Sequence, residues 1–247
     1  MKTVKLPESR KAPSNGAKQT EVETLAQTVD VPSLETRSVV IPIISKTPLI
    51  VHNWSTKATK MMLDKQMGIA SKGREKKDPF ADFLGSLYPI LGGKGYGLPA
   101  PAFKACAVSA ANSVELKMTQ MKQAFHVQTY TVQVNSAPLA AEFKTEWDET
   151  YADKLKPFHA LGIGMRMDIV RLESGVADLR FRGWWPKWEC ELEVEYNPRM
   201  LTLQQLINLF RAGGSGVGVG EWRPGAPMCR SGEHGRFDVK MALSQAA

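Results

Sequence analysis

The segment Trp188-Glu-Cys-Glu-Leu-Glu-Val-Glu-Tyr196 constrains the fold of this 247-residue chain most strongly. Apolar residues alternate with glutamates over nine positions, which predicts a β-strand with one face buried and the other in water. The water-facing row consists of Glu189, Glu191, Glu193 and Glu195. Because this row would repel phosphate, a polyanion cannot lie across this side of the sheet and must bind at loops and helix ends.

A helix and a glycine-rich loop follow this strand. Thr202 and Gln205 form a capping-box pattern, which predicts a helix over residues 202–212 that ends at Gly213. Its predicted buried face consists of Leu203, Leu206, Ile207 and Phe210. Five glycines lie between Gly213 and Gly220, so the backbone there can approach another group closely.

The chemistry of this loop has two interpretations. Bare backbone N–H groups in a glycine loop suit a phosphate-bearing ligand. The alternative is a helix cap followed by a glycine-rich strand or bulge. A Walker A loop is excluded, because Glu221-Trp222 follow Gly220 where that motif requires Gly-Lys-Ser/Thr.

Other segments complete a simple order of elements. An apolar strand is predicted over residues 39–51, a helix over 100–114, a strand over 124–134 and a terminal strand over 235–243. Together with the elements above, the order is βαββαβ. We therefore predict an α+β fold with a ferredoxin-like, RRM-like core, two helices on one face of an antiparallel sheet, and long insertions at about 52–97 and 135–164.

Composition indicates the domain organisation and the class of partner. Residues 1–37 lack apolar periodicity and are predicted to be a flexible basic arm, whereas residues 38–247 are predicted to be a single domain. The formal net charge of +7 and the pI of about 9.3 favour a polyanionic partner.

The cysteines and the apolar segments exclude other classes of protein. Cys106, Cys190 and Cys229 are widely spaced, which argues against a disulfide framework and a structural zinc site, so no metal or cofactor is predicted. No apolar run approaches the ~20 residues of a membrane span. We expect a cytoplasmic protein without a membrane partner.

A basic segment follows the first strand. Seven lysines and arginines lie between His52 and residue 77: Lys57, Lys60, Lys65, Lys72, Arg74, Lys76 and Lys77. They predict either a solvated helix face with a polar loop or one wall of a nucleic-acid groove with salt-dependent affinity. Lys104 lies near the start of a predicted helix, where a positive charge opposes the helix dipole and a bound anion would offset that.

Three short motifs carry a resemblance to a known family. They are Thr47-Pro-Leu-Ile-Val-His52, Leu98-Pro-Ala-Pro-Ala-Phe-Lys104, and Gly216-Val-Gly-Val-Gly220 followed by Gly235-Arg-Phe237. With them the chain resembles the RAMP superfamily over about residues 38–243. Within it the chain looks most like the Cas-seven-type backbone subunit of CRISPR effector complexes, and it is also similar to small phage-encoded proteins.

The resemblance implies a non-catalytic protein that binds single-stranded guide RNA. It implies head-to-tail copies along the strand, contact with other effector subunits, and an inserted hairpin that wedges between bases, for which residues 135–160 or Gly183–Pro186 are the candidates. Residues implied to hold the RNA backbone are His52, Asn53, Lys104, Gly216, Gly218, Gly220 and Arg223, and the flanking Arg211 and Arg236 are included as RNA-binding candidates.

Three alternatives remain open. A metal-independent RAMP endoribonuclease would use a histidine as general base, with His52, His126, His159 and His234 available. A protein-interaction module or subunit mimic would dock through the glutamate row. A recombination annealing protein would bind single-stranded DNA instead of RNA.

Overall fold

The computed structural model describes residues 35–54, 56–69, 76–171, 175–227 and 231–240, without the side chains of residues 56–58. These residues belong to one compact unit, Leu34–Ala247. Residues 1–34 of the predicted N-terminal arm lie outside the described residues, as do Lys72 and Arg74.

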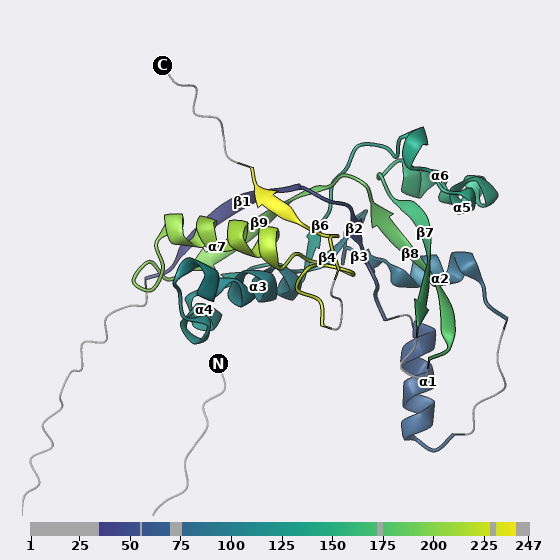
Figure 1. Cartoon of the computed structure of the whole chain (residues 1–247), viewed down its shortest axis with the longest axis horizontal. Helices are drawn as coiled ribbons and strands as arrows, with labels where there is room; N and C mark the ends of the chain where they lie inside the picture. Colours follow the sequence, from purple (N-terminus) through teal and green to yellow (C-terminus); the bar gives the residue numbers. More distant parts are fainter. Residues whose placement is uncertain (1–34, 55, 70–75, 172–174, 228–230, 241–247) are drawn as a thin grey trace, which may run out of the picture. The chain divides into compact units, whose positions relative to one another are not determined.

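Four strands form the central sheet in the order β10-β1-β9-β5, and every neighbouring pair is antiparallel (Figure 1). In chain order the core elements are β1 (Arg37–Ser45), α3 (Ala100–Ser109), β5 (Phe125–Val127), β9 (Glu189–Tyr196), α7 (Leu203–Gly216) and β10 (Phe237–Val239). This βαββαβ order with strand order 4-1-3-2 is that of a ferredoxin-like core. The predicted α+β class is therefore confirmed.

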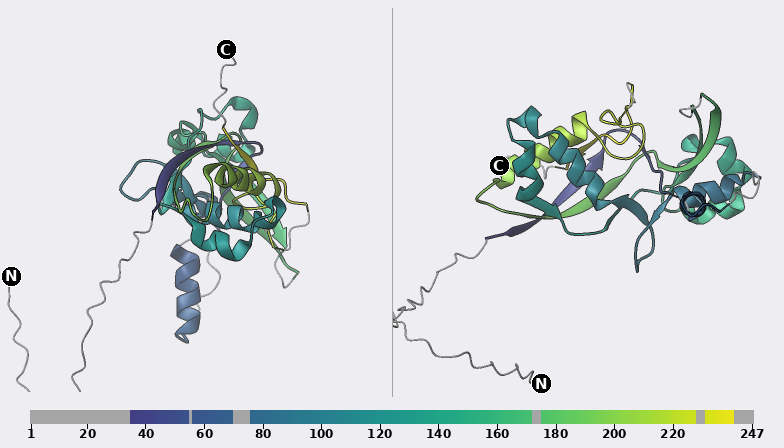
Figure 2. Two further views of the ribbon diagram at one scale, coloured as in Figure 1. Left: turned by 90° about the vertical axis from the view of Figure 1, so that its left-hand side faces the viewer. Right: turned by 90° about the horizontal axis from the view of Figure 1, so that it is seen from below.

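The two core helices lie side by side on one face of this sheet (Figures 1 and 2). Aromatic pairs fasten them to it: the ring centroids of Phe103 and Phe237 are 5.9 Å apart, and those of Phe125 and Phe210 are 5.6 Å apart. Such pairs add about 1 kcal/mol each beyond the burial of apolar area.

The predicted alternation of β9 is confirmed. Its apolar residues are buried from Cys190 to Tyr196, whereas Glu189, Glu191 and Glu193 are exposed and Glu195 is half-buried. Because β9 lies between β1 and β5, the acidic row runs along the middle of the face opposite the helices.

Two predicted strands are each divided between sheets. The strand predicted over 39–51 ends at Ser45, and β2 (Leu49–Ile50) pairs with a different partner in a second sheet, because Pro48 lies at a backbone corner tied to the Gly235 N–H. The strand predicted over 124–134 likewise becomes β5 and β6 (Thr131–Gln133), which pairs with β4 (Tyr96–Pro99).

The remaining elements belong mainly to the two insertions. Between β1 and α3 these are β2, α1 (Thr56–Gln66), α2 (Pro79–Ser86), β3 (Tyr88–Pro89) and β4. After α3 come η1 (Ala111–Val114) and α4 (Met118–Ala124), so the predicted helix over 100–114 ends as a 3-10 turn. Between β5 and β9 lie β6, η2 (Ala141–Phe143), α5 (Glu146–Thr150), α6 (Ala152–His159), β7 (Gly164–Arg171) and β8 (Ala177–Trp185).

The inserted strands form two further sheets, β2-β8-β7 and β3-β4-β6. The second insertion consequently extends beyond residue 164, because β7 and β8 pair with β2 and not with the core sheet. Residues 135–160, the favoured candidate for a wedging hairpin, form short helices. The long hairpin is β7–β8, and Gly183–Trp185 are the last residues of β8.

Helix α1 projects from the other described elements (Figures 1 and 2). Its apolar residues are exposed: Met61, Met62, Leu63, and beyond the helix end Met67 and Ile69. Helix α1 and the residues after it therefore present apolar side chains to the solvent.

Candidate nucleic-acid interface

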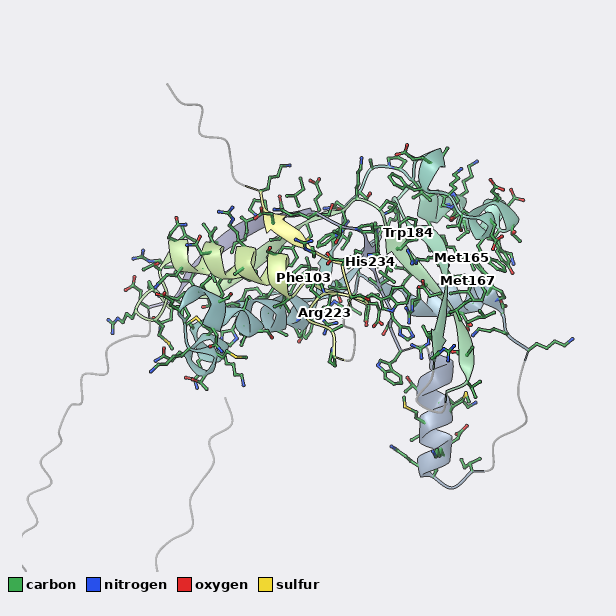
Figure 3. All side chains as sticks on the ribbon, in the orientation of Figure 1. Phe103, Met165, Met167, Trp184, Arg223 and His234 are labelled. Carbon is green, nitrogen blue, oxygen red and sulfur yellow. The ribbon has the colours of Figure 1, made fainter. Side chains whose placement is uncertain are left out.

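One groove of about 230 Å³ joins three segments that the sequence motifs singled out. They are the end of the Thr47–His52 motif, the start of α3 and the glycine loop. The lining residues include Val51, His52, Tyr88, Leu98, Pro99, Ala102, Ala105, Cys106, Ser109, Val217, Gly218, Val219, Gly220, Glu221, Arg223 and Gly225. Figure 3 labels Phe103 and Arg223 in this region, from α3 and from the loop.

The glycine loop is tied to the protein's own backbone. Gly220 has φ +76°, and a Cβ atom there would lie 2.5 Å from the carbonyl oxygen of Ile50. The N–H of Glu221 donates to that same oxygen at 2.9 Å, and the N–H of Val219 donates to Gly235 at 3.0 Å. The N–H of Gly218 donates to the Gly213 carbonyl at 2.9 Å. The prediction of bare N–H groups is therefore wrong at Gly218, Val219 and Glu221, where the close approach of the backbone serves the fold.

Helix α7 continues past its predicted end. Gly213 and Gly214 lie inside the helix, which ends at Gly216, with Val217 as its cap. A Cβ atom on Gly214 would lie 2.3 Å from the Phe237 carbonyl oxygen, and one on Gly213 would lie 3.1 Å from Cys106 and Ala107. These glycines allow α7 to pack closely on β10 and α3, so Gly213 is not a helix cap.

A buried arginine, which is not among the site residues predicted from the sequence, lies beside the groove. Arg182 is only 1% exposed, and its Nη1 and Nη2 atoms lie 3.5 Å from Asp168 and 3.8 Å from Glu221. Arg166 donates from Nε to the other oxygen of Asp168 at 2.8 Å. The available signal was the Arg180-Phe-Arg182 spacing, which places two cations on one face of a strand.

The pKa of His52 depends on this arginine. Partial burial lowers the pKa of the His52 imidazole, Arg182 lowers it further, and Glu221 opposes the shift. Since the ordinary pKa of 6.5 is lowered, the ring is neutral at pH 7. The hydroxyl of Tyr88 donates to the His52 carbonyl at 3.0 Å and fixes the backbone at the groove.

Trp222 connects the loop to the β7–β8 hairpin. The Arg166 guanidinium lies 5.6 Å from the centre of its ring, and the His234 ring stacks at 6.1 Å with an angle of 10° between the planes. Trp222 has φ +54°, a left-handed conformation that costs a non-glycine residue about 1–2 kcal/mol. The hydrogen bond from the His234 N–H to the Trp222 carbonyl helps to hold it.

Several predicted RNA contacts already have protein partners near the groove. The Asn53 side chain donates to the Leu87 carbonyl at 3.1 Å. Arg223 donates to the Gly220 carbonyl at 2.8 Å, and Arg236 donates to the Ser215 carbonyl and to Glu233. These side chains therefore brace the loop, and among them only Arg223 lines the groove.

Other predicted cations lie in ion pairs away from the groove. Arg211 bonds to Asp238 at 3.1 Å, and Lys77 bonds to Asp178 at 3.0 Å. Lys104 lies 3.1 Å from the Nδ1 atom of His126, outside the groove lining. Partial burial lowers the pKa of the Lys104 ammonium group.

The cations of α1 and the following segment face water. Lys60, Lys65 and Lys76 are exposed, and the side chain of Lys57 lies outside the described residues. Gly216 is also exposed and ends α7, with open space around it, so it does not line the groove. The predicted residues thus divide into a groove set, a bracing set and an exposed set.

Comparisons with known proteins are limited to fold. No family model matches the chain, and no curated protein matches it. Matching solved structures include Cmr6 from Pyrococcus furiosus, with 12% identity over 84% of this chain and 100% of that chain, at a TM-score of 0.34. The likeness is distant, and the ferredoxin-like assignment rests on the strand order of this chain itself.

Two kinds of feature are absent from the described residues: a metal-binding cluster and a helix able to cross a membrane. No group of three or more His, Cys, Asp or Glu side chains there could hold a metal ion. None of the helices in that part of the chain is long and apolar enough to cross a membrane.

Proposed function

We propose that this protein binds single-stranded RNA at the groove between the His52 loop, α3 and the glycine loop. The observation that carries the proposal is the convergence of these three segments, 51–52, 98–109 and 217–225, on one groove. They are far apart in the chain, and each contains or adjoins a motif of the RAMP resemblance. The acidic row on the opposite face of the sheet leaves this side as the one open to a polyanion.

Two kinds of contact would hold the strand. At the groove, the Arg223 guanidinium offers further hydrogen-bond donors besides the one bound to the Gly220 carbonyl, and the neutral ring of His52 offers a surface for stacking. Lys60, Lys65 and Lys76 would neutralise phosphates outside the groove, since they are exposed and α1 begins four residues after His52.

A second part of the proposal concerns the kind of RNA and the assembly in which the protein acts. By its resemblance, we infer that the RNA is a guide RNA and that copies of the chain follow one another head to tail in a CRISPR-type ribonucleoprotein. The β7–β8 hairpin is the long inserted hairpin of the described chain and therefore the candidate for the wedge between bases.

Binding is proposed to occur without cleavage. Metal-independent cleavage of RNA needs acid–base groups and a cation on the scissile phosphate. His52 is the one histidine among the groove-lining residues. Its proximity to buried Arg182 is the observation that keeps an endoribonuclease as the second candidate.

The test fills the groove without disturbing the core. Ala105 lines the groove and is exposed, so Ala105→Glu places a bulky negative charge there at little cost in stability. Fluorescence anisotropy with a labelled mixed-sequence RNA should show at least about a tenfold loss of affinity, or about 1.4 kcal/mol. Gln123→Glu, an exposed change on α4 outside the groove, is the matched control.

Equal affinities of the two variants would overturn the proposed groove. The same samples, run on a denaturing gel with and without magnesium, report cleavage. Intact RNA is expected, whereas cleavage that disappears in His52→Ala would establish the endoribonuclease. Single-stranded DNA of the same sequence should bind more weakly, and a preference for DNA would favour the annealing alternative.

A further inference from the structure

The outer edge of β7 is an unpaired strand edge. In the three-stranded sheet β2-β8-β7, this strand has a partner on one side only, and it is eight residues long. The hairpin is visible in Figure 1, and Figure 3 labels Met165 and Met167 on β7. A long edge of this kind presents a row of N–H and C=O groups to another chain.

Hydrogen bonds show which residues point outward. The N–H of Met165 donates to the Asp148 carboxylate at 2.9 Å, and its carbonyl accepts from the Thr145 hydroxyl at 2.8 Å. Its cross-strand partner, Gly183, accepts from Val51 on the β2 side at 3.1 Å. Met165 therefore faces away from β8, and alternation requires that Met167, Ile169 and Arg171 also direct their backbone groups outward.

Beyond Met165 the backbone of this edge has no hydrogen-bond partner outside the hairpin among the described residues, and the side chain of Met167 is half-buried beside α5. Only Met165 is capped by α5, and no described group hydrogen-bonds to the backbone of Met167 or Ile169 from outside the hairpin. Ile169 is 65% exposed, Leu179 of the neighbouring strand is 41% exposed, and Val176, just before that strand, is 59% exposed. An exposed edge with apolar side chains is the kind that other proteins shield with charge, proline or a covering element.

The lengths of the strands indicate which strand can pair with this edge. The other described outer strands are short: β5, β6 and β10 have three residues each, and β2 and β3 have two. None of them spans the five residues 167–171 that lie beyond the capped Met165, whereas the same five residues of a second copy match this edge in length and in the spacing of its outward groups. A two-fold axis makes such an edge complementary to itself.

We propose that two copies of this chain associate through β7, edge to edge and antiparallel, about a two-fold axis at Ile169. The two three-stranded sheets would then form one continuous sheet. In this register Met167 lies opposite Arg171 of the other copy, and Asp168 lies opposite Val170, so no like charges face each other. A register centred on Met167 fails, because it requires the Met165 groups that Asp148 and Thr145 occupy.

This association does not rest on RNA binding. It uses main-chain groups at the outer edge of β7, and none of β7 lines the groove. The inferred wedge is the one part of the proposed RNA contact that involves the same hairpin, so it would compete with this pairing. The dimer would form without RNA, whereas the proposed head-to-tail array requires it, so the two assemblies are separable by experiment.

A cysteine at the axis gives the sharpest test. Two Ile169→Cys residues would face each other across the axis with Cα atoms about 5.5 Å apart, within the range of a disulfide. The experiment uses a Cys229→Ser background, in which the remaining Cys106 and Cys190 are buried. Mild oxidation should convert most of the protein to a covalent dimer on a non-reducing gel.

Val176→Cys in the same background is the matched control, because it is similarly exposed but lies outside the paired edge. It should remain monomeric under the same conditions. If Ile169→Cys crosslinks no faster than Val176→Cys, or neither crosslinks, the proposal is wrong.

A second measurement does not depend on oxidation. Light scattering after size exclusion should give a dimer mass for the unchanged protein without RNA. Ile169→Pro removes the central N–H donor and should weaken the dimer at least about tenfold, while Ile169→Thr keeps the strand and the dimer. A monomer mass for the unchanged protein at its highest soluble concentration would also overturn the proposal, whatever the folding of the proline variant.

Discussion

The glycine loop and helix α1 were both predicted to contact an RNA backbone, yet the structure gives them opposite surroundings. In the loop, Val219 and Glu221 donate to carbonyls of the same chain, and Gly220 lies against Ile50. On α1, Lys60 and Lys65 face water. A cluster of glycines therefore marks close approach without saying to what, and here the approach is largely to the protein itself.

Substitutions in the two regions should therefore affect different properties of the protein. Changes at Gly220 and at buried Arg182 should act on the stability of the fold, whereas changes on α1 should act on affinity for RNA.

Substitution of Arg182 should cause the largest loss in the free energy of unfolding. Arg182→Leu leaves Asp168 and Glu221 without their shared cation, although Asp168 keeps the bond from Arg166 at 2.8 Å. Breaking a fully buried ion pair costs about 3–5 kcal/mol, so we expect a loss near the lower end of that range. Urea unfolding followed by circular dichroism measures the loss. Arg180→Leu is the control, because this more exposed arginine pairs with Asp178 at 3.6 Å and should cost less than about 1 kcal/mol. Similar losses for both would contradict the role of Arg182.

Substitution of Gly220 should cause the next largest loss of stability. Gly220→Val places a branched side chain at φ +76° and 2.5 Å from the Ile50 carbonyl oxygen, which should cost about 3 kcal/mol in the free energy of unfolding. Gly216→Ala is the matched control: a Cβ atom there meets open space at the end of α7, so stability should rise by up to about 1 kcal/mol. If Gly220→Val unfolds like the unchanged protein and only binding falls, the backbone at Gly220 itself contacts the ligand and the contrast with α1 disappears.

The lysines of α1 test the predicted effect on affinity for RNA. Lys60→Gln with Lys65→Gln should leave stability unchanged and lower RNA affinity, and the slope of log affinity against log salt should become shallower by about 1.4 for two lost phosphate contacts. The same two changes at Lys117 and Lys122, exposed lysines beside and on α4, are the control. Equal slopes for the two pairs would remove α1 from the binding surface.

The smallest effect is expected at Asp238, which pairs with the predicted RNA contact Arg211 and with Lys46. Partial burial raises the pKa of its carboxyl group, but bonds to Lys46, Val239 and Arg211 more than offset this, so the folded pKa lies below the usual 3.8. The ion pairs therefore stabilise the protein above that pH and are lost as the pH falls through the lowered pKa. Asp238→Asn should cost under about 1 kcal/mol at pH 7 and nothing near pH 2, as thermal unfolding across pH would show.

Local patterns were sufficient for the core of this protein. The alternation from Trp188 to Tyr196 and the capping box at Thr202 predicted β9 and the start of α7, because each pattern reports burial on its own element. With the other apolar segments they led to the ferredoxin-like order, whereas the family resemblance placed His52 and the glycine loop among the candidate site residues.

Features that depend on distant partners came only from the folded chain. Residues 39–51 and 124–134 are each continuous in β propensity, but different neighbours divide them between sheets. Arg182 stands out only when Asp168 and Glu221 lie beside it, and β7 becomes a free edge only when β8 and α5 occupy their places. A residue's own preferences act over a few neighbours in sequence, whereas pairing, burial of charge and exposure of an edge depend on which remote segments fold against it.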